Sequence, residues 1–351
     1  MVKNYDSAVM TALSEQTRTG AVTLADIARR AGVSPITASR ALRSTAVVAQ
    51  ATRERVLAVA AELGYVPNLL ARGLVQNRTA TVGVVVLELS NPFFVPMLSA
   101  VESIAAKRGF LMVVGESGRD ADKERRYVEQ FQQLRIGGII VTTASRWFDH
   151  LAAARAGGTP VVLMARRWDE GDYVTADHVE AGRLVGKHLL ARDYRRVGLV
   201  WTHEPENTAI EERILGVRQV LADAGVELQD RWNLRTPTTL LEDGMDAADR
   251  YLAMPERPRA VFVSTDRQAM GFVERVVAHG VRVPEDMAIV SYDDIPFAAC
   301  ARVPLTTVAI PMRRMGELAA EILFDRLDGA AGPEARQILL QPELIVRASS
   351  P

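Results

Sequence analysis

From Thr81 onwards, short runs rich in valine and isoleucine alternate with longer segments that have the spacing of amphipathic helices. Such nearly unbroken apolar runs are typical of parallel strands that are covered on both faces. Strands are expected at Val82–Leu87, Leu111–Val114, Gly138–Thr142, Val161–Met164, Val197–Trp201, Ala260–Ser264 and Ile289–Tyr292. The helices between them are expected at Phe94–Lys107, Ala121–Gln133, Glu180–Ala191, Glu211–Ala224, Gly244–Leu252 and Gln268–His279. This alternation predicts a doubly wound α/β fold, and about 270 residues are enough for two lobes of that kind.

Polar and aromatic side chains follow several of the expected strands. Ligands of open α/β sheets bind at the carboxyl ends of the strands, so these residues are candidates for a binding cleft between the lobes. They are Asn91, Phe93, Phe94, Arg166, Arg213, Asp266 and Asp293. Carboxylates accept hydrogen bonds from hydroxyl groups and aromatic rings cover apolar faces, so the set fits a sugar or a similar polyol. Taken singly, each residue also fits an ordinary role as a surface cap, an ion-pair partner or a core ring.

The charge is distributed unevenly along the chain. Residues 1–78 contain ten Lys and Arg against five Asp and Glu, whereas the remainder contains 32 against 38. A basic head on an acidic body indicates contact with a polyanion, although charge alone is also compatible with chance.

The basic segment has the pattern of a helix-turn-helix. Thr23 and Asp26 form a near capping box at the start of one helix, and Gly32 suits the left-handed position at its end. Ser34 then caps a second helix with Pro35 at its first position. A third helix is expected from about Gln50 to Leu63. Two short helices joined by a tight turn, followed by a third, form a DNA-binding head, unless they are merely a small bundle with a polar face.

The second helix is the expected reader of the major groove. Its outward residues are Pro35, Ile36, Thr37, Ser39, Arg40 and Arg43. In that groove an isoleucine can contact a thymine methyl group, and hydroxyl groups can hydrogen-bond to base edges. Arg40 can bind either a guanine or a phosphate.

The run VTLADIARRAGVSPITASRAL, followed by TRERVLAVAAELGYVPNLLARGL, resembles the head of the LacI/GalR (lactose-repressor/galactose-repressor) family of transcription regulators. The resemblance covers residues 22–75 almost without a gap. It implies a hinge helix at Asn68–Val75, which orders when two copies meet on DNA and inserts Leu74 into the minor groove as a wedge. Without the resemblance, Leu74 would be taken as an ordinary packing leucine. The implied DNA contacts are Thr23, Ser34, Pro35, Ile36, Thr37, Ser39, Arg40, Arg43, Tyr65, Asn68, Ala71, Arg72 and Leu74.

The body resembles the regulatory core of the same family, which is similar in fold to periplasmic sugar-binding proteins. The markers are NPFF, the run Glu211–Gly216, the run Val283–Asp294 and the run Pro304–Val308. The resemblance implies effector contacts from Phe93, Phe94, Arg213, Asp266 and Asp293, with Asp293 first among them.

The chain departs from the family pattern at several positions. In the head, Arg43 stands where Asn is usual, and Ala49 gives up a helix cap worth about 1 kcal/mol. In the body, Ala165 replaces a common Asp, Ser291 a Gly and Ile310 a Gln. Arg166 together with Arg213 could favour an anionic group such as a sugar-acid carboxylate or a phosphate. Arg166 could equally be an ion-paired residue at the rim.

The sequence contains no phosphate-binding GxxxxGK[ST] loop, no GxGxxG turn after a strand and no HExxH motif, so neither an enzyme nor a cofactor or metal is expected. A single cysteine, Cys300, and the absence of a signal-like or membrane-spanning run favour the cytoplasm. The alternative is a solute-binding protein or sugar enzyme with an incidental helical head.

We therefore expect a sequence-specific DNA-binding regulator, most simply a repressor, that binds a pseudo-palindromic operator as a homodimer and responds to a sugar, a sugar acid or a related metabolite. The expected parts are an arm at 1–20, the head at 21–66, the hinge at 67–78 and the core at 79–351. Within the core, lobe 1 takes about 79–177 and 310–339, and lobe 2 about 178–309 and 340–351.

Overall fold

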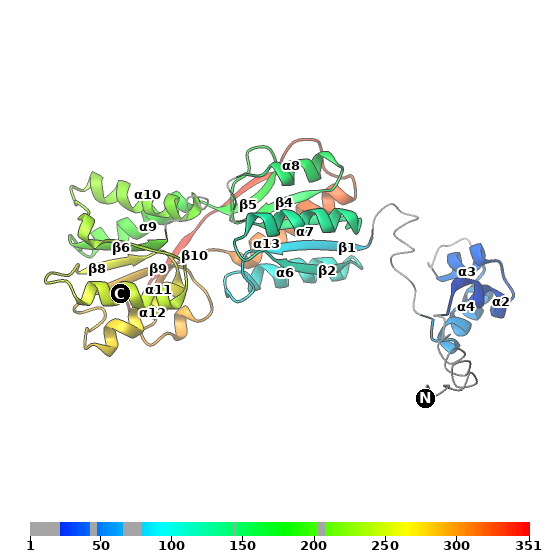
Figure 1. The fold of residues 1–351 in the computed structure, drawn as a ribbon, viewed down its shortest axis with the longest axis horizontal. Helices are drawn as coiled ribbons and strands as arrows, with labels where there is room; N and C mark the ends of the chain where they lie inside the picture. Colours follow the sequence, from blue (N-terminus) through cyan, green and yellow to red (C-terminus); the bar gives the residue numbers. More distant parts are fainter. Residues whose placement is uncertain (1–21, 43–47, 66–78, 144, 146, 203–207) are drawn as a thin grey trace, which may run out of the picture. The chain divides into compact units, whose positions relative to one another are not determined.

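The computed structural model describes residues 22–42, 48–65, 79–143, 145, 147–202 and 208–351. The chain divides into two compact units, Met1–Arg72 and Gly73–Pro351 (Figure 1). The predictions made for the arm at 1–20, for the hinge helix and for Arg43, Asn68, Ala71, Arg72 and Leu74 lie outside the described residues.

The described residues of the first unit contain three helices: α2 at Leu24–Ala31, α3 at Pro35–Leu42 and α4 at Gln50–Glu62. Helix α2 begins with a complete capping box, in which the Thr23 hydroxyl accepts from the Asp26 amide and the Asp26 carboxylate accepts from the Thr23 amide. It ends at Gly32, whose φ of 64° favours a residue without a β-carbon. These features confirm the predicted helix-turn-helix.

A small core holds the three helices together. Its buried residues are Ile27, Ala28, Ala31, Ala38, Ala41, Val56 and Ala60. Helix α4 begins after Ala49 without a side-chain cap, as the sequence suggested. It ends at Glu62, ahead of Gly64, whose φ of 62° favours a glycine at the end of a helix.

The second unit has two lobes, each built on a six-stranded sheet. In lobe 1 the strand order is β11-β5-β4-β3-β1-β2, and in lobe 2 it is β12-β10-β9-β8-β6-β7. The strands of lobe 1 are β1 Thr81–Val86, β2 Leu111–Glu116, β3 Gly138–Thr142, β4 Val161–Met164, β5 Asp172–Ala176 and β11 Gln337–Leu340. Those of lobe 2 are β6 Val197–Thr202, β7 Asn233–Thr236, β8 Ala260–Val263, β9 Ala288–Asp293, β10 Thr306–Ala309 and β12 Glu343–Ile345. Every neighbouring pair is parallel except β10 with β12, which confirms the doubly wound fold.

Helices cover both faces of each sheet (Figure 1). Lobe 1 carries α6 Val95–Lys107, α7 Ala121–Gln133, α8 Asp149–Ala156 and α13 Met312–Leu327. Lobe 2 carries α9 His178–Ala191, α10 Thr208–Asp223, α11 Leu241–Leu252 and α12 Asp266–Ala278, with short 3₁₀ turns at Asp230–Trp232 and Ala298–Cys300. Helix α6 packs on α13, α9 on α10 and α11 on α12. The chain passes between the lobes after β5, after β10 and after β11, which ties the two sheets together at one side of each.

All seven predicted strands and all six predicted core helices are present, with boundaries shifted by no more than a few residues. The prediction did not include β5, β7, β10, β11, β12, α8 or α13. Within the described ranges, no helix has the length and apolar character needed to span a lipid bilayer.

Candidate functional site

A cleft of about 720 Å³, part of it open to solvent, lies between the two lobes of the second unit. Its walls are formed where the strands of both sheets end, as expected for parallel α/β structures. Lobe 1 contributes segments that follow β1, β2, β3 and β4, and lobe 2 contributes α10 and the segments that follow β7, β8 and β9.

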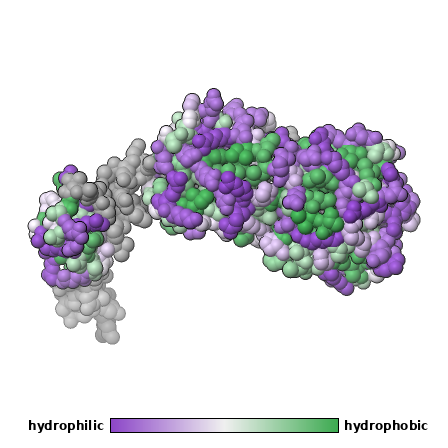
Figure 2. Space-filling view, turned by 180° about the vertical axis from the view of Figure 1, so that it is seen from behind, coloured by the Kyte–Doolittle hydropathy of each residue, from purple (hydrophilic) through white to green (hydrophobic). Residues whose placement is uncertain are grey.

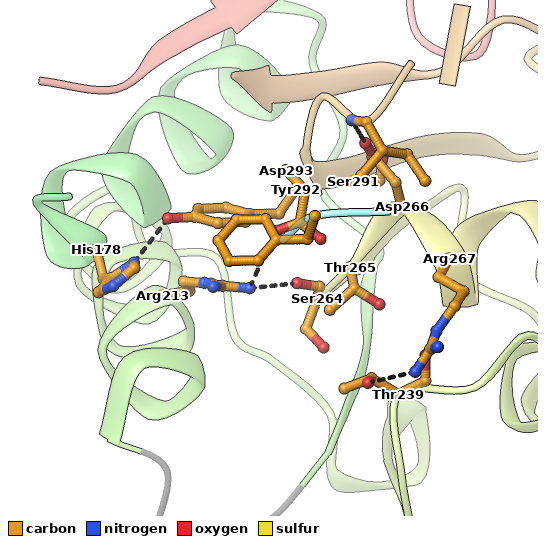
Figure 3. A network of polar contacts seen from close by, with 12 residues as sticks. His178, Arg213, Thr239, Ser264, Thr265, Asp266, Arg267, Ser291, Tyr292 and Asp293 are labelled. Atoms are coloured by element: carbon orange, nitrogen blue, oxygen red, sulfur yellow. Dashed lines mark hydrogen bonds and ion pairs between the residues drawn. The ribbon is translucent and has the colours of Figure 1, made fainter. Parts of the chain in front are cut away.

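Arg213, on α10, is the central cation of the lobe 2 wall (Figure 3). Its Nη1 donates to the carbonyl oxygen of Ser264 at 2.8 Å and lies 4.0 Å from Oδ1 of Asp293. The guanidinium carbon stands 3.5 Å from the centre of the Tyr292 ring, close enough for a cation–π contact. The buried Nε has no hydrogen-bond partner among the described residues.

Two glycines allow α10 to bring Arg213 to this place. A β-carbon on Gly182 of α9 would come within 2.0 Å of the Arg213 carbonyl oxygen, and one on Gly216 of α10 within 2.1 Å of the Val179 carbonyl oxygen. The two helices therefore touch backbone to backbone. Larger residues would push α10 away from α9 and displace the guanidinium.

Asp293 ends β9 with an unusual backbone. Its φ is 120°, and that of Asp294 is 57°, so both occupy a region that non-glycine residues rarely adopt. Strain of this kind persists where the surrounding structure enforces it and is often found at functional sites. Burial raises the pKa of the Asp293 carboxyl, while the Arg213 guanidinium opposes that rise.

His178 joins Arg213 and Tyr292 in the same wall, although the sequence did not identify it. Its Nδ1 lies 2.7 Å from the Tyr292 hydroxyl, and its Nε2 lies 3.3 Å from the Thr175 hydroxyl (Figure 3). Burial and then the Arg213 charge hold its pKa well below the ordinary value of 6.5, so the ring is neutral. One sequence signal could have identified His178: it is the first residue of α9, directly after the chain leaves lobe 1.

Arg166 lies in the lobe 1 wall and is only 6% exposed. Its two terminal nitrogens donate to the carbonyl oxygens of Thr143 and Ser145, each at 3.4 Å. Ala165, with a φ of 62°, turns the chain at the end of β4 and directs the arginine inward.

Asp266 does not reach the cleft, contrary to the prediction. It is fully buried, and its carboxylate accepts hydrogen bonds from the Ser291 hydroxyl at 2.5 Å, the Thr307 hydroxyl at 2.7 Å and the Ile295 amide at 2.9 Å. Burial raises its pKa, against the effect of these three donors. Because α12 begins at Asp266, the side chain turns towards β9 and β10 instead of towards the other lobe.

The apolar part of the lobe 1 wall is formed by Phe93 and Phe94, whose rings meet edge to face with centroids 5.1 Å apart. Asn91 precedes them and accepts a hydrogen bond from the Phe93 amide at 3.1 Å. Six of the seven predicted effector residues thus line the cleft. The polar lining residues that the prediction missed are Glu88, Arg119, Thr142, Thr143, His178, Thr239 and Thr265.

The head presents a separate candidate surface around the start of α3. Ile36 is 66% exposed there, which is unusual for an isoleucine in a small domain. Ser34 caps the helix by accepting from the Thr37 amide at 3.1 Å. Thr23, Ser34, Pro35 and Arg40 are exposed, Thr37 and Ser39 are half-buried, and Tyr65 is half-buried against the core of the head.

The described residues contain no group of three or more His, Cys, Asp or Glu side chains that could hold a metal ion. The site therefore offers charges, hydroxyl groups and rings for binding a small organic molecule.

Comparisons with known proteins match both units. A family model described as bacterial regulatory proteins, lacI family, matches residues 23–68, and one described as periplasmic binding protein-like domain matches residues 187–350. The HTH-type transcriptional repressor PurR of Photobacterium profundum is 33% identical over 332 residues, covering 93% of this chain and 98% of that protein. PurR of Vibrio parahaemolyticus is 32% identical, with 93% and 97% covered.

Solved structures give the same picture. The lac repressor dimer bound to operator and the anti-inducer ONPF matches with a TM-score of 0.85 and 25% identity, covering 94% of this chain and 99% of that one. The complex of the transcriptional regulator CelR with cellobiose matches with a TM-score of 0.70 and 30% identity, covering 93% and 99%.

Proposed function

The chain belongs to the LacI family of bacterial transcriptional regulators and is a DNA-binding repressor with an effector-binding core, and we propose that it is a cytoplasmic homodimer whose operator affinity is set by a small anionic polyol bound in the cleft. This family excludes the alternative of a sugar enzyme with an incidental head. We assign the head to residues 21–66, the hinge to 67–78 and the core to 79–351. Helix α3 reads the major groove, and Leu74 of the hinge enters the minor groove.

The arrangement of Arg213 between Tyr292 and Asp293 carries the effector proposal. Asp293 can accept hydrogen bonds from hydroxyl groups, and the Arg213 guanidinium beside it brings a positive charge to the same site. Phe93 and Phe94 cover an apolar face from the opposite lobe. Polar groups placed against an aromatic wall are typical of sites for polyols.

The balance of charge favours an anionic group on that polyol. The cleft is lined by Arg119, Arg166 and Arg213 against Glu88 and Asp293, an excess of guanidinium groups. Guanidinium binds carboxylates and phosphates in a planar, two-bond geometry. The relative CelR was solved with cellobiose, a neutral sugar, so the acid group is the distinguishing part of this proposal.

Exposed apolar side chains on the second unit support the proposed homodimer. On the face shown in Figure 2, apolar surface gathers over both lobes of the second unit among hydrophilic side chains. Leu111 of the edge strand β2 is 59% exposed and Val95 of α6 is 51% exposed. Apolar surface of this kind often marks a protein interface.

To test the proposed effector, an operator is first isolated from genomic fragments that the protein binds. The affinity of the protein for this operator is then measured by mobility shift in the presence of a neutral sugar or its matching sugar acid, such as glucose and gluconate, or galactose and galacturonate. We expect an acid to change operator affinity and its neutral partner not to. Asp293→Asn should lose that response, whereas Asp328→Asn, at an exposed carboxylate of lobe 1, should keep it. Binding of neutral sugars without any sugar acid would refute the anionic effector.

The DNA part is tested with the same operator. Deleting residues 1–78 should abolish DNA binding and leave effector binding intact. Leu74→Ala should weaken operator binding, and full-strength binding by this variant would remove the wedge assignment. Because phosphate contacts release counterions, the logarithm of the affinity should fall linearly with the logarithm of the salt concentration.

A further inference from the structure

An ion pair closes one side of the cleft. Glu88 follows β1 in lobe 1, and Arg267 is the second residue of α12 in lobe 2. Two hydrogen bonds join them, Nη1 to Oε1 at 2.8 Å and Nη2 to Oε2 at 3.0 Å. The two side chains are only 14% exposed for Arg267 and 19% exposed for Glu88. The pair therefore joins the two lobes directly, away from the three chain crossings.

Thr239 extends this contact into a network. It lies after β7 in lobe 2 and accepts from Arg267 twice, at its carbonyl oxygen from Nε at 2.9 Å and at its hydroxyl from Nη2 at 3.2 Å (Figure 3). Arg119 of lobe 1 donates to the same hydroxyl at 2.9 Å. Glu88, Arg119 and Thr239 also line the cleft, so this network forms part of the effector site's own wall.

The geometry makes the network sensitive to lobe spacing. A planar guanidinium and a carboxylate keep both bonds only at one separation and one relative orientation, so a small opening breaks both. Because both side chains are largely buried, salt screens this pair less than it would screen an exposed one. The Arg267 hydrogen bonds hold the pKa of Glu88 below its ordinary value, so its carboxylate stays charged.

A second ion pair joins the lobes less tightly. Arg167 of lobe 1 approaches Glu212 of lobe 2 only to 3.9 Å, and burial raises the pKa of Glu212. Of these two ion pairs, the one between Glu88 and Arg267 therefore makes the closer contact.

We propose that Glu88 and Arg267 are positioning residues that hold the lobes at the spacing needed to grip an effector, so that breaking this pair separates the lobes and widens the cleft. The inference rests on the proposed function, because it takes the cleft as the effector site.

The test measures the distance between the lobes in the full-length protein by pulsed electron paramagnetic resonance. Nitroxide labels are placed at the exposed Glu129 of α7 and Asp246 of α11, after Cys300, which is also exposed, is replaced by serine. Labelled protein is diluted with unlabelled protein so that only distances within one chain contribute. No ligand or DNA is added, so the result is independent of whether the effector or operator has been identified correctly.

We expect Glu88→Arg and Arg267→Glu each to shift the distribution towards longer distances, with about a tenfold fall in the ratio of closed to open molecules. The double reversal should move the distribution back towards the wild-type distance, because it rebuilds the pair with exchanged charges, although a carboxylate at position 267 cannot donate to the Thr239 carbonyl oxygen. Glu88→Gln should give an intermediate distribution. Asp328→Arg, in the Arg108–Asp328 pair within lobe 1, is the matched control and should change nothing.

Two results would overturn the proposal. One is that the single reversals keep the wild-type distance between the lobes. The other is that the double reversal melts at the wild-type temperature but keeps the longer distance of the single reversals. Melting temperatures measured in parallel identify any variant that fails to fold. If a charge reversal fails to fold, the distances in the milder variants Glu88→Gln and Arg267→Lys are used to test the proposal instead. Failure of the proposed function would appear elsewhere, as an absence of sequence-specific DNA binding.

Discussion

Asp266 and Asp293 show how two buried carboxylates at neighbouring strand ends take different roles. Asp266 is surrounded by three donors from its own lobe, whereas Asp293 faces Arg213 in the cleft. The sequence places both after strands and cannot separate them, because the direction of each side chain depends on the backbone at the strand end. One signal was present: Ser291, which replaces the family's glycine, supplies a hydroxyl to Asp266.

Asp266→Ala should therefore act on stability. The substitution leaves two hydroxyl groups and one amide without their acceptor in a buried place, so we expect a loss of about 3 kcal/mol in the free energy of unfolding. Urea denaturation of the full chain measures it, with Asp328→Ala as the exposed control. An unchanged midpoint would show that the donors find other acceptors.

His188 provides a second prediction, about pH. Burial, and then the charge of Arg192, lower the pKa of His188 to about 4, and its Nε2 lies 2.9 Å from the Ser350 hydroxyl. In the unfolded chain the ring titrates near 6.5, so as the pH falls below that value the unfolded state gains a proton that the folded state does not. Between pH 7.5 and 5 this single group should cost about 2 kcal/mol of stability.

The comparison with His188→Gln isolates that contribution, because the buried carboxyl groups of the same lobe titrate in the opposite sense and are common to both proteins. Urea midpoints at pH 7.5 and at pH 5 should show the wild type losing more stability than the variant. Equal losses in the two proteins would mean that His188 is protonated in the folded state.

The residues missed around the cleft have a common cause. Thr239 follows β7, a strand that was not predicted, and Glu88 and Arg119 come from segments just beyond the strand ends. Their importance comes from partners in the other lobe, such as Arg267 for Glu88. No local pattern reveals a partner that is distant in the sequence.

At the scale of elements, strands that form continuous apolar runs were predictable, whereas shorter or more polar strands were missed, including the buried β5 and β10. Strands β3 and β4 are buried at every residue and read as continuous apolar runs. Strand β11 alternates between exposed and half-buried positions, and β12 has only three residues. Short strands of mixed character resemble loops until a neighbouring strand provides their hydrogen bonds.

The contact between α9 and α10 leads to a prediction at this scale. Gly216→Ala adds a β-carbon that would meet the Val179 carbonyl oxygen, so the helices must separate and α10 must carry Arg213 with it. We expect a loss of about 1–3 kcal/mol in stability and a weaker response to effector. The neighbouring Leu215→Ala is the control, since Leu215 is 47% exposed. Denaturation and mobility shifts measure the two effects, and a full effector response in the glycine variant would show that α10 does not position Arg213.

At the scale of the whole molecule, three chain crossings and several polar contacts between described residues connect the two lobes of the second unit. The crossings follow β5, β10 and β11, and the pair of Glu88 with Arg267 adds a reversible connection at the cleft. The arrangement of lobes was predictable because alternating strands and helices permit few topologies. The contact between Glu88 and Arg267 was not predictable from the sequence, because it depends on the distance between two sheets.

The last prediction concerns the coupling of effector to operator. If one equilibrium between lobe arrangements links the two sites, the factor by which an effector changes operator affinity must equal the factor by which operator changes effector affinity, typically about 5- to 150-fold. Titrating labelled operator with and without effector, and effector with and without operator, measures both factors. In Arg267→Glu, where we expect the lobes to separate, both factors should shrink together towards one, and the double reversal with Glu88→Arg should move both back towards their wild-type values. A variant that retains the full factor on operator affinity would show that coupling does not pass through the spacing of the lobes.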